Sequence, residues 1–242
     1  MNRRNLLGSV GSLGVGLILN GCTDENRSSS AKKPFSPIQN EKATEGEVTA
    51  VEDLMREHGV LRRMLFVYSE TAVKLRSNPG AVDLNALQKT AKLFRNFGED
   101  YHEKKLEEVY IFPMVKSAGS RAAMYPDILI AQHNRGREIT DYILTVTRRR
   151  ELSADDFVQL AGVMESMVRM YRAHAAREDT AVFPAWKQTL TAKQLDEMND
   201  KFEDIEHQQF GEDGFEKAVG QISDIENELG LSDLGQFTAA PI

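Results

Sequence analysis

The sequence of 242 residues contains only one cysteine, seven prolines and no long basic run. A single cysteine excludes a disulfide framework and a cluster of thiolate metal ligands within one chain. The net charge of −7, without a basic cluster, argues against a nucleic-acid partner. No segment shows the two-residue period of a half-buried strand. Because few prolines leave room for long helices, these absences together favour an all-α protein.

Residues 1–22 are expected to be an export signal rather than part of the fold. Arg3 and Arg4 precede an apolar stretch, residues 6–19, that is too short for an ordinary membrane span. The signal ends in Leu19-Asn20-Gly21-Cys22, which resembles a lipoprotein processing box with cleavage before Cys22 and acylation of its thiol. An uncleaved anchor is the alternative. The sequence therefore predicts an exported protein, lipid-anchored at Cys22 on the periplasmic or outer side of the membrane.

The start of the chain, Asn2-Arg3-Arg4-Asn5-Leu6-Leu7, also resembles a twin-arginine export signal. That route carries proteins that have already folded, which suits a protein that takes up a metal before export. General secretory export is the alternative. Residues 23–46 are rich in Ser, Lys, Glu and Pro, and we expect them to form a flexible tether.

Apolar residues recur at helical spacing through the rest of the chain. The spacings of three and four that begin at Val51 and Leu54 are typical of one helix face. This pattern and the capping signals predict helices over about 47–77, 83–113 and 126–149, a fourth from 153, and two more over 191–209 and 215–229. Four long helices joined by short to moderate loops predict an antiparallel four-helix bundle over residues 47–187. A C-terminal extension of helices, followed by a tail, is expected over residues 188–242.

Four of the five histidines fall on different long helices, namely His58, His102, His133 and His174. At about 1.5 Å per residue, all four lie at nearly the same height in an antiparallel bundle. One histidine on a helix is more often a core or surface residue. Four at one level predict a metal site, because imidazole binds iron, zinc, copper and nickel. His207, on the fifth helix, is expected to be a surface or packing histidine.

Two glutamates bring carboxylates to the level of the histidines. Glu178 follows His174 by four residues, so the two side chains share a helix face. Glu107 follows His102 by five residues, yet both glutamates stand at the same distance before a Phe-Pro pair, residues 112–113 and 183–184. A π-bulge would bring Glu107 onto the histidine face. Glu99 is the alternative second carboxylate.

Nitrogen and carboxylate donors without cysteine favour a non-haem iron pair bridged by the two carboxylates, with zinc or manganese as alternatives. A ferritin-like di-iron bundle needs two Glu-x-x-His pairs, and only Glu99-x-x-His102 is present. Glu103, one residue after His102, is expected to point about 100° away from the site.

As a set, these segments resemble the hemerythrin-like, or HHE cation-binding, family over about residues 48–187. The segments are Glu57-His58, Tyr101-His102, Glu107-Glu108 before Phe112-Pro113, Gln132-His133, and His174 to Glu178 before Phe183-Pro184. The resemblance implies a four-helix bundle around a non-haem di-iron centre that binds oxygen or, in some relatives, nitric oxide. The ligands it implies are His58, His102, Glu107, His133, His174 and Glu178. Arg137 stands where typical hemerythrins carry a further histidine.

Three functions are compatible with such a site. The favoured hypothesis is a protein that binds oxygen or nitric oxide for storage, scavenging or sensing. The second is a redox enzyme: an oxidase, a peroxidase, or a nitric oxide reductase in stress repair. The third is a zinc-loaded structural bundle. The first two hypotheses need the same ligands and an open metal position, so the sequence does not distinguish between them. It also identifies no electron-transfer partner.

Overall fold

The structure, a computed structural model, describes residues 48–211 and 213–242. The predicted export signal, its Cys22 and the tether lie outside these residues, so they stay predictions. Residues 49–242 pack as one unit. Within the described ranges, no helix is both long enough and apolar enough to span a bilayer.

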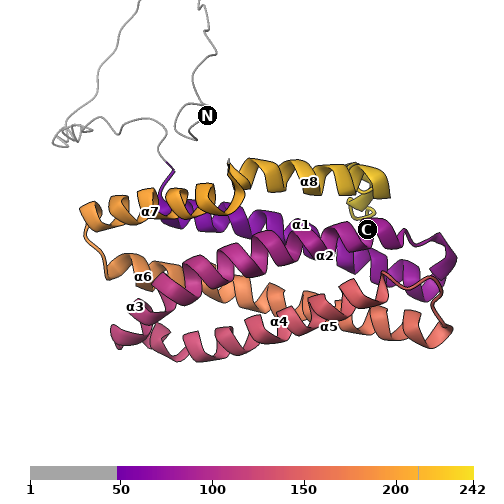
Figure 1. The fold of residues 1–242 in the computed structure, drawn as a ribbon, viewed down its shortest axis with the longest axis horizontal. Helices are drawn as coiled ribbons and strands as arrows, with labels where there is room; N and C mark the ends of the chain where they lie inside the picture. Colours follow the sequence, from indigo (N-terminus) through magenta and orange to yellow (C-terminus); the bar gives the residue numbers. More distant parts are fainter. Residues whose placement is uncertain (1–47, 212) are drawn as a thin grey trace, which may run out of the picture. The chain divides into compact units, whose positions relative to one another are not determined.

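Four long helical segments form the antiparallel bundle predicted from the sequence (Figure 1). They are α1 (Ala50–Ser77); α2 (Leu84–Leu93) continuing through η3 (Phe94–Ile111) into α3 (Phe112–Ser117); α4 (Pro126–Val146); and α5 (Ala154–Arg177) continuing through η5 (Glu178–Val182) into α6 (Phe183–Gln188). Segment α1 packs against α5 and against α2 and η3, and α4 packs against α5 and η3. Each long segment therefore has two neighbours around a shared interior.

The helices begin where side chains can bond the free backbone N–H groups of the first turn. Asp83 caps α2, and reciprocal capping boxes start α5 at Ser153 and α7 at Thr191, as the sequence predicts. Thr49 forms another such box, so that α1 begins at Ala50, three residues later than expected. Pro126 opens α4, where its missing N–H costs nothing.

The middle of the second long segment is a π-helix of 18 residues, η3. The sequence predicted a single π-bulge, whereas the end of the segment at Ser117, a few residues past Pro113, agrees with the prediction. The N–H of Phe112 bonds the carbonyl of Glu107, five residues earlier, and the N–H of Phe183 does the same to Glu178. A proline has no N–H and its ring crowds the preceding turn, so each Phe-Pro pair favours this wider winding.

Two further helices, α7 (Ala192–Phe210) and α8 (Gly214–Leu229), cover the side of the bundle formed by α1, α2 and η3 (Figure 1). Gly211 and Gly230 end them with positive φ angles, which a residue with a Cβ adopts only at a cost. The ring of Phe210 contacts the rings of Phe97 and Tyr101, which fastens α7 to η3.

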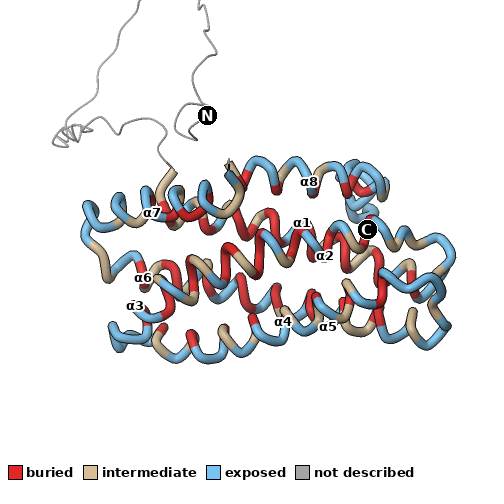
Figure 2. Tube along the Cα trace, in the orientation of Figure 1, coloured by how far each residue is buried: buried red, intermediate tan, exposed pale blue. Residues whose placement is uncertain are grey.

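Buried residues line the inward faces of all four long segments (Figure 2). At the end where α1 and α4 finish and α2 and α5 begin, the interior is mostly apolar. We call this the apolar half; its buried members include Val67, Leu75, Leu87, Ile143, Leu160 and Met164. The other half, which we call the site half, buries the histidines and several carboxylates among apolar residues. All six predicted site residues lie there.

Candidate metal centre

The structure brings the six predicted site residues together at one level of the bundle interior. His58 comes from α1, His102 and Glu107 from η3, His133 from α4, His174 from α5 and Glu178 from η5. None is more than 3% exposed. The heights counted along the helices therefore predicted this meeting point.

Each of the two glutamates lies between histidines of two different helices. For Glu107, one carboxylate oxygen is 3.4 Å from Nε2 of His102 and the other is 3.4 Å from Nε2 of His133. For Glu178, the corresponding distances are 3.0 Å to Nε2 of His174 and 3.5 Å to Nε2 of His58. Each carboxylate thus connects two imidazoles that come from different helices.

The π-helix explains how Glu107 reaches this position. In π-helical winding, residues five apart lie above one another, so His102 and Glu107 face the same way. Glu99, the alternative carboxylate, lies elsewhere: Thr140 donates to it at 2.6 Å, and Arg95 Nε lies 3.0 Å from it. Glu99 belongs to none of the groups of donors close enough to share a cation.

The donor set fits a pair of cations. All four carboxylate oxygens of Glu107 and Glu178, and Nε2 of His102, are buried without a hydrogen-bond partner in the described structure. Leaving a buried polar atom unsatisfied is costly, and such atoms are rare in folded proteins. Donors of Glu107, His133, His174 and Glu178 lie within 4.8 Å of one another, as do those of His58, His102 and Glu107. Cations at these two places would satisfy the orphaned atoms.

A ring of hydrogen bonds orients the four imidazoles. The Nδ1 atom of each histidine lies 2.6–2.9 Å from an oxygen of a neighbouring helix: His58 from Asp179, His102 from Glu57, His133 from Glu108 and His174 from Gln132. Such a partner fixes the tautomer and turns Nε2 toward the centre. Each partner stands beside a site residue in the sequence. Every long helical segment therefore supplies a site residue and, next to it, the side chain that orients a histidine of a neighbouring segment.

Burial and neighbouring charges shift the pKa values of the site residues in different directions. Although burial acts in the other direction, His102 and His133 hold the pKa of Glu107 well below its usual value. Burial and the nearby charge of Glu107 raise the pKa of Glu178 well above its usual value. Burial disfavours a charged His133, but its neighbouring carboxylates outweigh that effect and raise its pKa to about 10. Cations compete with these protons, so metal binding releases protons.

The expectation that Glu103 points away from the site is wrong. Its side chain is buried, accepts a hydrogen bond from the Tyr171 hydroxyl at 2.7 Å and lies 3.2 Å from the Arg137 guanidinium. Glu103 still lies to one side of His102, but the bundle interior extends to that side, where Tyr171 and Arg137 receive its carboxylate. An angle from His102 therefore does not carry a residue out of the interior.

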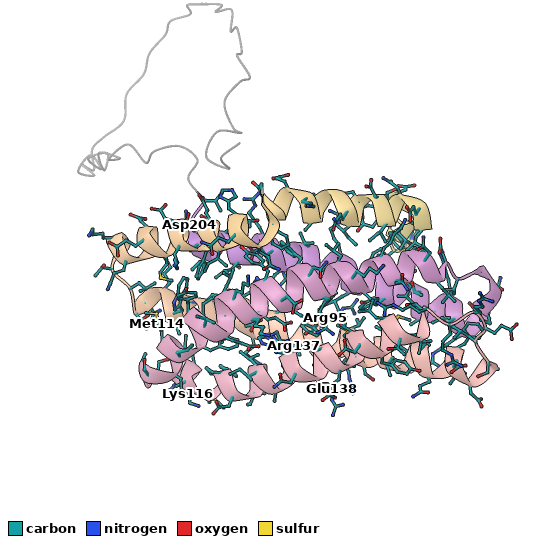
Figure 3. All side chains as sticks on the ribbon, viewed as in Figure 1. Arg95, Met114, Lys116, Arg137, Glu138 and Asp204 are labelled. Atoms are coloured by element: carbon teal, nitrogen blue, oxygen red, sulfur yellow. The ribbon has the colours of Figure 1, made fainter. Side chains whose placement is uncertain are left out.

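Arg137 binds two carboxylates beside the histidines, because its guanidinium also lies 2.6 Å from Glu108, the partner of His133. Figure 3 shows Arg137 and Arg95 at the middle of the bundle, whereas Glu138, next along α4, points outward. Glu138 is paired with Arg135 on the surface. His207 is exposed on α7, as expected for a surface histidine.

A cavity of about 10 Å³ adjoins the cluster. Its wall combines site residues with Leu61, Arg62, Leu65, Glu103, Tyr171 and Ala175. About one water-sized sphere fits a space of this size. The cavity therefore admits a very small molecule beside the site and excludes a larger one.

A helical bundle that gathers four imidazoles and two carboxylates at one buried level is built for cation binding. The chain belongs to the hemerythrin HHE cation-binding domain family, whose model matches residues 49–186. It is also 39% identical over 243 residues to uncharacterized proteins of Mycobacterium tuberculosis and Mycobacterium bovis, covering 98% of this chain and 91% of theirs. No solved structure matches.

Proposed function

We propose that the protein holds two iron ions and binds oxygen or nitric oxide at them. One observation carries the proposal: Glu107 and Glu178 each lie between two histidines from different helices. One ion would take His58 and His102, the other His133 and His174, and both glutamates would bridge. Two imidazoles and two carboxylate oxygens leave positions free on a six-coordinate ion.

Iron is favoured over zinc by the same donors. Imidazole and carboxylate ligands around open positions are typical of non-haem iron. The described part of the chain has no cysteine to supply the thiolates common in structural zinc sites. When bound, ferrous iron supplies electrons and an open position to a diatomic molecule.

The residues around the site favour binding of a small gas. Leu61, Leu65 and Ala175 give the adjoining cavity an apolar wall, and its volume of about 10 Å³ suits a diatomic molecule better than an organic substrate. Storage, scavenging and sensing all use such binding. Turnover of the bound gas by a redox enzyme is the competing outcome.

The test is anaerobic loading with ferrous iron, metal analysis, and optical spectra before and after oxygen or nitric oxide is added. We expect two iron ions per chain and a new absorption band that disappears when the gas is removed. Only one ion, or zinc alone from iron-replete cells, would contradict the di-iron centre. Repeated consumption of the gas with a reductant would establish an enzyme instead.

We further propose that a lipid on Cys22 holds the protein at a membrane, outside the cytoplasm. The support is the sequence of residues 1–22 alone. Intact-mass measurement of the exported protein should show an acylated chain beginning at Cys22. A Cys22→Ala variant that still fractionates with membranes would argue against the anchor.

A further inference from the structure

Tyr171 lies against the metal centre without being one of its predicted ligands. Its side chain is fully enclosed, and its ring centroid is 5.3 Å from that of His174 and 5.1 Å from that of Phe94. Its hydroxyl donates a hydrogen bond of 2.7 Å to a buried oxygen of Glu103. The phenol is therefore close to a ligand on one side and bonded to a carboxylate on the other.

The fold leaves room for this hydroxyl at one specific place. A Cβ built on Gly136 would lie 2.1 Å from the Tyr171 oxygen, far inside contact distance. Gly136 is on α4, between His133 and Arg137. The missing side chain thus makes space for the phenol, while Arg137, 3.2 Å from the other oxygen of Glu103, holds the carboxylate in place.

A second buried tyrosine provides a natural comparison. Tyr68 is also buried, and its ring centroid lies 6.1 Å from that of Phe94, the ring that Tyr171 contacts too. Its hydroxyl has no hydrogen-bond partner among the described residues. Removing an electron from a phenol makes its O–H very acidic, so oxidation is easy only where a base can take the proton. Tyr171 has that base, and Tyr68 does not.

We propose that Tyr171 is a one-electron donor to the metal centre, with Glu103 as the acceptor of its proton. The proposal rests on the iron pair proposed above. The electron leaves the phenol toward the centre past His174, and the proton moves along the 2.7 Å hydrogen bond to Glu103. The product is a neutral tyrosyl radical beside a protonated carboxyl group.

Tyr171 is needed as an electron donor when the two irons alone cannot supply the electrons that an oxidant takes up. Hydrogen peroxide takes two electrons and two protons to form two waters. In a chain with one ferrous and one ferric ion, the ferrous ion supplies one electron and becomes ferric, and Tyr171 supplies the other. The solvent provides both protons, and the phenolic proton stays on Glu103, so charge and atoms balance. With two ferrous ions, the irons supply both electrons and Tyr171 stays reduced.

The test is electron paramagnetic resonance of the iron-loaded protein, frozen soon after mixing with hydrogen peroxide. Iron content is measured first for every variant. Protein with one ferrous and one ferric ion should give an organic radical signal that narrows when the tyrosine rings are deuterated, and di-ferrous protein should give almost none. Tyr171→Phe, which keeps the ring, should abolish the signal, and Gly136→Ala should reduce it severalfold by displacing the hydroxyl.

Tyr68→Phe is the matched control and should leave the signal unchanged. A signal that survives Tyr171→Phe at equal iron content, or one that disappears in Tyr68→Phe instead, would overturn the inference. Equal loading with no organic radical would overturn it too, while leaving the di-iron proposal intact. A wild-type protein that binds no iron pair would instead be a failure of the proposed function, seen in the metal analysis.

Discussion

The two halves of the bundle are built from the same four segments but bury different chemistry. The apolar half contains residues such as Leu75, Leu160 and Met164, and its helices wind as ordinary α-helices. The site half buries charged groups at Glu107, Glu178 and their neighbours, and includes both π-helical segments. Burying apolar side chains stabilises a fold, whereas burying a carboxylate costs free energy unless it is paired or binds a metal.

The two halves therefore contribute differently to the free energy of folding. Burial of apolar side chains in the apolar half stabilises the bundle, and part of that stabilisation offsets the cost of burying the metal-ligand side chains of the site half at one level. Substitutions in the apolar half should therefore lower the stability of the protein without changing metal binding. Substitutions of the metal-ligand side chains in the site half should lower metal binding more than they change stability.

The largest expected effect is on metal content. Glu107→Ala and Glu178→Ala should each bind one iron ion, or two weakly, because the loss of a bridge removes a ligand from both ions and leaves their repulsion less compensated. Iron per chain after anaerobic loading is the measurement. Glu138→Ala, an exposed change on α4, is the control and should keep both ions. Two tightly held ions in either bridge variant would show that the carboxylate is not a shared ligand.

In the apolar half, Met164→Ala should lower the free energy of unfolding by about 2–5 kcal/mol, because it opens a cavity at a fully buried position. Denaturant unfolding of the metal-free protein measures this loss. The loaded variant should still hold two iron ions, since residue 164 lies ten residues, roughly 15 Å, from His174 along α5. A parallel loss of iron would mean that the two halves are not separable.

The hydrogen bonds to Nδ1 should matter less than the bridges. Glu57→Ala removes the carboxylate that orients His102 and should weaken iron binding by about 10–100-fold without changing the number of ions at saturation. Competition with a chelator gives the affinity. Glu151→Ala, exposed between α4 and α5, should bind iron like the wild type. Equal affinity for Glu57→Ala would mean that packing alone orients His102.

The smallest expected effect is on the pH dependence of stability, and it concerns the buried Glu99 of η3. Burial and the charge of Glu103 raise the pKa of Glu99 to about 8. The folded protein therefore keeps a proton that the unfolded chain has released, and stability falls as pH rises through 8. Between pH 7 and pH 9 the metal-free wild type should lose about 1 kcal/mol more than Glu99→Gln does. Urea titrations at both pH values measure the difference, and identical losses would place the proton elsewhere.

The sequence predicted the bundle and the meeting of six residues in its interior, because helix periodicity and equal heights depend only on spacing along the chain. Their role as metal ligands stays a prediction. The repeated Phe-Pro pair placed Glu107 correctly despite its five-residue spacing. The length of η3 was not predictable, since π-helical winding depends on packing as well as on one proline. The predicted direction of Glu103 was wrong because the residues that receive its carboxylate, Tyr171 and Arg137, come from other helices.

The ring of Nδ1 partners was also missed, although its signal is in the sequence. Glu57, Glu108, Gln132 and Asp179 each stand beside a residue of the cluster. Which histidine each one serves depends on how neighbouring helices are rotated against one another. That rotation, like the small cavity and the space above Gly136, is decided by tertiary packing.

The central claim is that two cations share Glu107 and Glu178. Diffraction from crystals of the iron-loaded protein, with anomalous data collected at the iron absorption edge, tests it most directly. We predict two anomalous peaks, one beside His58 and His102 and the other beside His133 and His174, with both glutamates bridging them. A single peak, or two peaks that Glu107 does not connect, would contradict the account.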